Sequence, residues 1–423
     1  MKQHPREPSN SSPVKVDTEK GWFCHFHHQT QAQFICTEES LILCEQCILS
    51  REHDGHEKRS LKDCIKFLFR DYATPEKSSA ERRLLESPIS EAQQKNIQEQ
   101  TIKELNDFVK VVVLENDSEV EKLESLPSKA DINSLEITTS ATSALLGLSQ
   151  VTDTGAKRIA AYIKNMTSLN NLEISLRYST ATEVGINELA ASIATLPELA
   201  YLKLDFGLDC VVTEGVFKSL AAAISKLNVL EHLALSLKHL KGIENLKILS
   251  ELKYLKRVTL DLDWNEPYFE SVIEFLSSLE RVQNLAVRID EVKTPQKSRL
   301  ELLASAVVKL QHLGYFRLDA PHNKSITDSG IDALAFALKG KPLVGLKLDF
   351  LYSSLSNAGL NTLITVVQTM PNLSELYLNI AACTNISNRG LLAFAAGLRN
   401  LKSLHDLYLQ ITGCANIQDT TFQ

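Results

Sequence analysis

The stretch LYLNIAACTNISNRGLLAFAAGL, residues 376–398, combines two patterns in sequence order. It begins with Leu376-x-Leu378, an alternation of apolar and polar residues typical of a short β-strand with one buried face. After a polar loop, Ser387 precedes a segment with apolar residues at 391, 394, 395 and 398, which is the spacing of one helix face. Serine is a favoured residue at the position before a helix. The stretch therefore predicts a strand, a loop and a helix.

The same unit recurs along most of the chain. Strand cores of this kind begin at Leu172, Leu202, Leu233, Val258, Leu285, Phe316, Leu346, Leu376 and Leu407, and an earlier, less regular copy begins at Leu135. From Leu172 onward, successive copies start 25 to 31 residues apart. Helical segments open at Thr152, Thr182, Thr327, Ser356 and Ser387, each with glycine three residues later. This period is typical of stacked repeats, so we expect about ten strands over residues 131–423.

These repeats resemble the leucine-rich-repeat family in its longer form, similar to ribonuclease inhibitor and RanGAP. The resemblance implies an α/β solenoid with parallel strands on the concave face and helices on the convex face. The copies near Val258 and Leu285 are shorter and lack the Thr-x-x-Gly opening, so we expect irregular geometry there.

The polar residues within the strand cores suggest where a protein partner binds. In Leu-x-Leu-x the leucines face the core and the intervening residues face the concave side, because strand side chains alternate. Tyrosine and arginine are frequent interface anchors. The predicted contact residues, all in the last four repeats, are Arg317, Asp319, Lys347, Asp349, Tyr377, Asn379 and Tyr408. The alternative is that Lys and Asp neighbours only pair with each other on a solvated face.

Cysteine and histidine cluster near the start of the chain, in CHFHHQTQAQFICTEESLILCEQCILSREHDGH, residues 24–56. Four pairs of metal-binding residues, each pair separated by two residues, are Cys24 and His27, Cys36 and Glu39, Cys44 and Cys47, and His53 and His56. Thiolate and imidazole ligands favour Zn²⁺, and eight ligands suit two ions. His28 is an alternative to His27. Because all eight ligands are used, we expect structural rather than catalytic zinc.

This cluster resembles the type 2 B-box zinc finger of tripartite-motif proteins, which places the module at residues 21–64. The resemblance implies a cross-braced arrangement. One ion then takes Cys24, His27, Cys44 and Cys47, and the other takes Cys36, Glu39, His53 and His56. The family usually has Asp or Cys where this chain has Glu39. No cysteine precedes Cys24, so the RING finger of tripartite-motif ligases is absent from this sequence.

The segments around the module differ in character. Residues 1–20 are polar and predict a disordered tail, and residues 76–130 predict a linker. Residues 89–126 contain no Pro or Gly, and their apolar spacing indicates a helix. This helix forms a coiled-coil dimer or packs on the first repeat as a cap. Homo-oligomers would form through the B-box or through this helix.

Composition narrows the class of protein. The chain of 423 residues has 45 Lys and Arg against 52 Asp and Glu, so a net charge of −7 argues against non-specific nucleic-acid binding. No apolar run reaches the length of a membrane helix, and no secretory signal is present. We expect an intracellular protein, located in the cytoplasm. Cys383 and Cys414 occupy the same position in neighbouring repeats, so we expect them to be stacked, buried thiols. At the end, NIQDTTFQ begins a further loop and helix, so either Phe422 and its neighbours cap the solenoid or the chain is a fragment.

The sequence shows no nucleophile elbow, phosphate-binding glycine loop or HExxH motif. The prediction is therefore a non-enzymatic interaction scaffold, in which the repeats recognise a protein and the B-box mediates self-association or recruitment. One alternative is a ubiquitin-system adaptor that acts with a ligase on another chain. Another is a GTPase activator of the RanGAP kind, for which no catalytic arginine is identified.

Overall fold

The computed structural model divides into two compact units, residues 1–105 and 106–423. It describes residues 34–36, 41–43, 58–60, 109–124, 126, 132–139, 150–207, 210, 212–238, 240–262, 268–289, 299–414 and 416–417. In the first unit, three strands form an antiparallel sheet in the order β2-β1-β3. They are β1 (Phe34–Cys36), β2 (Leu41–Leu43) and β3 (Lys58–Ser60).

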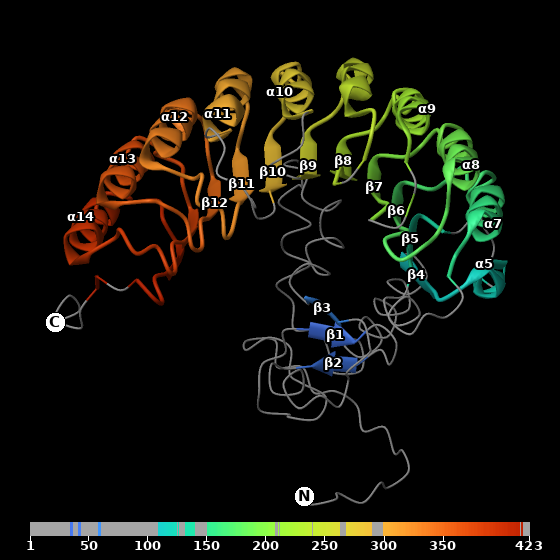
Figure 1. Ribbon diagram of the computed structural model, residues 1–423, viewed down its shortest axis with the longest axis horizontal. Helices are drawn as coiled ribbons and strands as arrows, with labels where there is room; N and C mark the ends of the chain where they lie inside the picture. Colours follow the sequence, from blue (N-terminus) through green and yellow to red (C-terminus); the bar gives the residue numbers. More distant parts are fainter. Residues whose placement is uncertain are drawn as a thin grey trace, which may run out of the picture. The chain divides into compact units, whose positions relative to one another are not determined.

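The second unit is built on one sheet of 11 parallel strands, paired in sequence order from β4 to β14. The strands are β4 (Val109–Leu114), β5 (Ser134–Thr139), β6 (Asn171–Ser175), β7 (Tyr201–Asp205), β8 (His232–Ser236), β9 (Arg257–Leu262), β10 (Asn284–Ile289), β11 (Tyr315–Asp319), β12 (Gly345–Asp349), β13 (Glu375–Asn379) and β14 (Asp406–Gln410). The unit curves, with the strands on its inner side and the helices on its outer side (Figure 1). This confirms the predicted leucine-rich-repeat solenoid.

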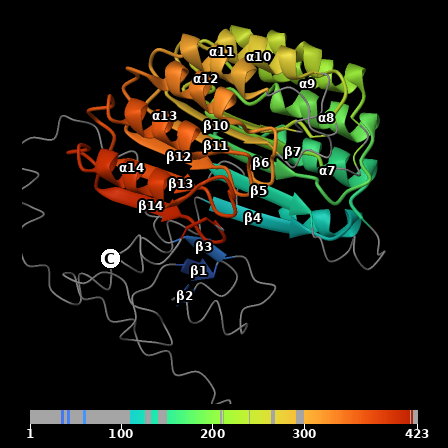
Figure 2. The ribbon, with the colours of Figure 1, turned by 60° about the vertical axis from the view of Figure 1, so that its left-hand side comes forward.

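Helices connect the strands and cover one face of the sheet (Figure 2). They are η2 (Asp117–Val120), α5 (Glu121–Glu124), α7 (Asp153–Ile163), α8 (Glu183–Ile193), α9 (Glu214–Ile224), η3 (Ile243–Glu251), α10 (Phe269–Ser277), α11 (Leu300–Lys309), α12 (Asp328–Leu338), α13 (Asn357–Val367) and α14 (Asn388–Leu398). In the part of the chain that the structure describes, no helix is both long and apolar enough to cross a membrane.

The core lies between the sheet and the helices, and one aliphatic ladder runs through all repeats. Leu346 and Leu348 of β12 are fully buried, as are Leu360 and Val367 of α13. Thr152, Thr182, Thr213 and Ser356 precede helices and accept a hydrogen bond from a backbone N–H of the first turn, as their sequence position predicts. Thr327 and Ser387 also precede helices but make no such bond.

The helix predicted over residues 89–126 is wrong at Val109–Leu114, which form strand β4 and pair in parallel with β5. Val112 and Leu114 are buried on the core side of this strand, and Val120 and Leu123 are buried in the short helical turns that follow. The repeats therefore begin before residue 131, and the sheet has one strand more than expected. Residues 89–108 of the predicted helix lie outside the described residues, so its role as a coiled coil or a cap stays a prediction.

The middle of the solenoid departs from the strand, loop and helix unit. Between β8 and β9 the connection is the 3-10 helix η3, which starts after Gly242 in a left-handed conformation (φ 83°). The step from Leu233 to Val258 is the shortest after Leu172, and the tighter helix fits the smaller number of residues. Helices α10 and α11 also begin without a side-chain cap. These departures lie in the repeats that the sequence marks as shorter and as lacking the Thr-x-x-Gly opening.

Candidate functional site

The strand register places the predicted contact residues in two rows across the last four strands. Arg317, Lys347, Tyr377 and Tyr408 are paired in one row, and Asp319, Asp349, Asn379 and Gln410 are paired in the other. On β11 and β12 the leucine or phenylalanine positions are buried, whereas Arg317 and Lys347 are exposed. The predicted alternation of core and concave side chains is therefore confirmed for these strands.

Two tyrosines, half-buried Tyr377 and exposed Tyr408, form an aromatic pair on this face. The rings of Tyr377 and Tyr408 are stacked, with centroids 4.3 Å apart and an interplanar angle of 1°. The Tyr408 side chain is 47% exposed, and its hydroxyl donates to Gln410 Oε1 at 2.8 Å. Burial raises the pKa of Tyr377, and the nearby Asp349 carboxylate raises it further. The stacked rings offer a flat contact surface.

In the row that begins with Asp319 and Asp349, both carboxylates interact with groups of the protein itself. The Arg317 guanidinium binds Asp319 through two nitrogens, with Nη2 2.6 Å from Oδ2. Asp349 Oδ1 accepts from the Leu351 N–H at 3.1 Å and from Asn379 Nδ2 at 3.0 Å. The sequence predicted that Asn379 contacts a partner, but Asn379 is only 5% exposed. Its side chain instead supports Asp349. Lys347 forms no ion pair with any residue that the structure describes.

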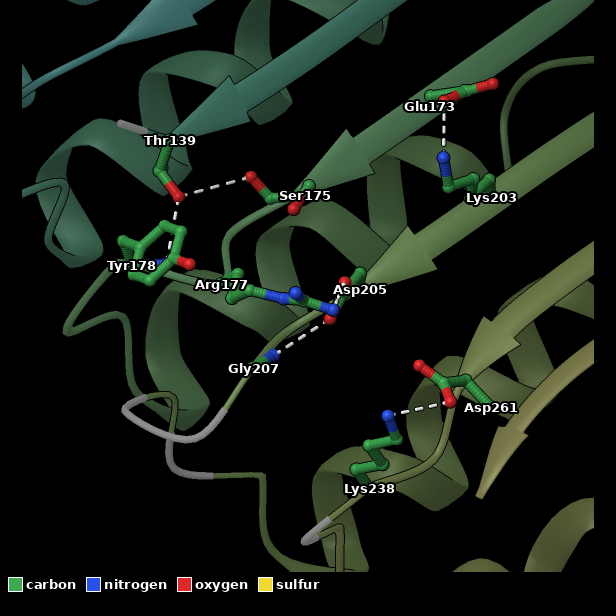
Figure 3. Close-up of polar contacts among 10 residues, drawn as sticks. All are labelled: Thr139, Glu173, Ser175, Arg177, Tyr178, Lys203, Asp205, Gly207, Lys238 and Asp261. Carbon is green, nitrogen blue, oxygen red and sulfur yellow. Dashed lines mark hydrogen bonds and ion pairs between the residues drawn. The ribbon is translucent and has the colours of Figure 1, made fainter. Parts of the chain in front are cut away.

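The amino-terminal half of the concave side has a different character. Its charges lie in closed pairs between neighbouring repeats: Glu173 with Lys203, Arg177 with Asp205, and Lys238 with Asp261, at 2.8–2.9 Å (Figure 3). The predicted alternative, in which neighbouring charges pair with each other, concerned the last four repeats, and there Arg317 pairs with Asp319. The combination of stacked aromatic rings with a lysine that forms no ion pair is found on β12–β14.

A rim of residues after the strands was not predicted from the sequence. His322 and Tyr352 have left-handed backbone conformations (φ 57° and 59°) at the repeat position that Gly413 occupies after β14. Their rings lie 5.9 Å apart, and the Lys324 ammonium is 4.9 Å from the Tyr352 ring centroid. Glycine adopts this conformation without cost, whereas other residues are strained there. The sequence signal that could have revealed this rim is the presence of His and Tyr at a repeat position where Gly413 occurs in the last repeat.

Three cysteines of the second unit are buried and free. Cys383 Sγ contacts the Phe350 carbonyl oxygen at 3.3 Å, and Cys414 Sγ contacts that of Ile380 at 3.2 Å. Asn385 and Asn416 bond the loop backbone of the preceding repeat, as predicted for this ladder. Within the described residues, no group of three or more potential metal ligands occurs.

Of the eight predicted zinc ligands, only Cys36 lies in a described segment. It ends β1 and pairs with Leu41 of β2 and with Lys58 of β3. The predicted ligands outside the described residues are Cys24, His27, Glu39, Cys44, Cys47, His53 and His56. The pairing places Cys36 next to Lys58, which follows His56 by two positions in the sequence. The chemistry of the donor set, thiolate and imidazole with one carboxylate, suits Zn²⁺.

Residues 19–61 match the family model of the B-box zinc finger. The chain carries a B-box joined to leucine-rich repeats. This family implies zinc binding by the B-box.

Solved structures with similar architecture have low sequence identity to this chain. The crystal structure of the yeast Rad7 and Elc1 complex matches with 15% identity and a TM-score of 0.45, covering 86% of this chain and 96% of that one. A Bacteroides fragilis protein matches with 11% identity and a TM-score of 0.39, covering 85% and 89%. The leucine-rich-repeat protein LegL7 from Legionella pneumophila matches with 14% identity and a TM-score of 0.38, covering 70% and 99%. The comparison with curated proteins found no match to this chain.

Proposed function

We propose that this protein is a non-enzymatic, intracellular interaction scaffold. Its repeats bind a protein partner on the concave side of β11–β14, and its B-box provides self-association or recruits a second protein. The observation that carries the proposal is the stack of half-buried Tyr377 and exposed Tyr408 on a sheet face. Large rigid side chains of this kind supply contact area at low cost in conformational entropy.

The contrast between the two halves of the concave side supports this location. In the amino-terminal half, three ion pairs join acids to cations within the protein. Charges that are already paired in this way contribute little free energy to binding a partner. On β12–β14, Lys347 lies beside Tyr377 without an ion pair among the described residues. The rim residues His322 and Tyr352 extend the aromatic surface past the ends of β11 and β12.

For the B-box we propose two structural Zn²⁺ ions in the cross-braced arrangement. The backbone pairing of Cys36 with Lys58 supports one shared set, because Lys58 follows His56 by only two positions in the sequence. Glu39 completes this set as a carboxylate ligand. The other set consists of Cys24, His27, Cys44 and Cys47.

The test is partner capture by the full chain, compared between two variants and quantified by mass spectrometry. Tyr377→Ala with Tyr408→Ala removes the aromatic pair, and we expect the specifically bound proteins to be lost. Tyr254→Ala is the matched control, since Tyr254 is 57% exposed and lies outside the sheet strands. Equal recovery with both variants would contradict the proposed surface. Circular dichroism establishes that both variants are folded.

A further inference from the structure

Two carboxylates face each other across the last two strands. The register pairs Glu375 at the start of β13 with Asp406 at the start of β14. Each lies two residues before a tyrosine of the stack, so all four side chains share the concave face. Within the described residues, neither carboxylate forms an ion pair or a side-chain hydrogen bond.

This arrangement is unfavourable for the protein alone. Neighbouring strands of a sheet lie about 5 Å apart, and like charges directly opposite each other destabilise the pairing. Other acids on the same face are compensated: Asp319 by Arg317, and Asp349 by two hydrogen-bond donors. Glu375 and Asp406 lack such compensation among the described residues, and Asp406 is exposed.

The last four strands carry an acidic surplus. On β11–β14 the concave rows hold four carboxylates against two cations, and one of these cations, Arg317, is bound to Asp319. In the amino-terminal half, three ion pairs each join an acid to a cation. Lys347 lies on β12, two strands from Tyr408 and Asp406, so it does not neutralise the outer strand.

We infer that the concave surface over β13 and β14 binds an arginine-bearing basic segment of a protein partner. The inference rests on the proposed function and names the chemistry of that partner. One guanidinium of this segment lies between the Glu375 and Asp406 carboxylates. Another stacks on the face of Tyr408 that Tyr377 leaves uncovered, since Tyr408 is 47% exposed. Arginine suits this surface better than lysine, because its planar group stacks on aromatic rings and binds carboxylates with two hydrogen bonds.

The test uses the zinc-loaded full chain and three fluorescein-labelled peptides of equal length. One alternates Arg with Ser, the second Lys with Ser, and the third Glu with Ser. Fluorescence anisotropy is expected to show the tightest binding for the Arg peptide, at least about tenfold tighter than for the Glu peptide. Glu375→Gln with Asp406→Asn is expected to weaken Arg-peptide binding by about tenfold.

The matched control is Glu173→Gln with Asp205→Asn, which changes the net charge equally on the same sheet face. We expect this control to leave Arg-peptide affinity within about twofold. Tyr408→Leu is expected to reduce the preference for Arg over Lys. Equal affinity for the three peptides, or an equal loss in both double variants, overturns the inference.

Failure of the inference can be separated from failure of the proposed function. The Glu375→Gln and Asp406→Asn chain is also used in partner capture, beside the Tyr377→Ala and Tyr408→Ala chain. If the partner is lost only with the tyrosine variant, the concave surface binds a protein but does not recognise a basic segment. If neither variant loses it, the proposed surface fails as well.

Discussion

The Asp153 carboxylate occupies the space that a side chain at position 185 would need. Asp153 Oδ1 accepts from the N–H groups of Thr182 at 2.7 Å and Gly185 at 3.0 Å, and Oδ2 accepts from the Thr182 hydroxyl at 2.6 Å. The first turn of α7 is thereby bonded to the first turn of α8. Asp117, Asp328 and Asn357 make corresponding bonds to the next repeat. The Thr-x-x-Gly motif is therefore a joint between repeats.

Gly185→Ala is expected to lower the free energy of unfolding by about 1–3 kcal/mol. A Cβ there would lie 2.7 Å from Asp153 Oδ1, 2.8 Å from Ala156 Cβ and 3.1 Å from Asp153 Cα, so backbone must move. Urea unfolding followed by circular dichroism measures the change. Gly215→Ala in the first turn of α9 is the control, because its nearest neighbours are 3.9 Å away. A similar loss in both variants contradicts the proposed crowding.

Asp153→Asn is expected to destabilise the protein by about 1–2 kcal/mol near neutral pH. Burial opposes the charge of Asp153, but the hydrogen bonds from Thr182 and Gly185 hold its pKa below the usual range. A lowered folded pKa gives stability that is present above the unfolded pKa of about 3.9 and is lost as pH falls through the folded value. The difference between the two chains should therefore narrow below about pH 4.

Urea titrations at several pH values measure this difference. Asp332→Asn is the control, because Asp332 is exposed on α12 and has no hydrogen bond or ion pair among the described residues. A gap between wild type and Asp153→Asn that stays constant down to pH 2 would show that the carboxylate charge is not responsible.

Cys383 and Cys414 are expected to resist alkylation in the folded protein. Burial raises the pKa of both thiols, and the thiolate is the reactive form. Iodoacetamide labelling mapped by mass spectrometry should modify both residues quickly only in urea. Fast modification of the native chain would mean that these repeats open readily, which the burial of Cys383 and Cys414 opposes.

Purified protein is expected to contain two zinc ions per chain by elemental mass spectrometry. In a cross-braced B-box, Cys44→Ser should release both ions, because each ion holds together segments that the other needs. His25→Ala is the control, since His25 lies outside the ligand pattern and should leave zinc content unchanged. Loss of a single ion from Cys44→Ser would show that the two sites fold independently.

The error in element type at Val109–Leu114 came from competing periodicities. Val112 and Leu114 alternate as a strand, and Val120 and Leu123 follow as a helical turn, yet their combined spacing resembles one helix face. Three consecutive valines, residues 111–113, favour a strand, because β-branched side chains are restricted in helices. Pairing with β5 decided between the two.

The candidate site was predictable in position but not in its contacts. The Leu-x-Leu spacing predicts that Arg317, Lys347 and Tyr377 share a row, because parallel strands pair repeat by repeat. It does not predict that Asn379 is buried against Asp349 or that Arg317 binds its own strand neighbour Asp319. Those choices depend on rotamers, which adapt to neighbours in space.

The sequence alone determined the repeat period, the face of each strand and the zinc-binding character of the amino-terminal segment. These follow from residue spacing, which is a local property of the chain. Only the tertiary structure decided which charges are satisfied internally and which, like Glu375 and Asp406, have no partner among the described residues. Electrostatic interactions depend on distances between residues about thirty positions apart, and those distances exist only once the repeats have stacked.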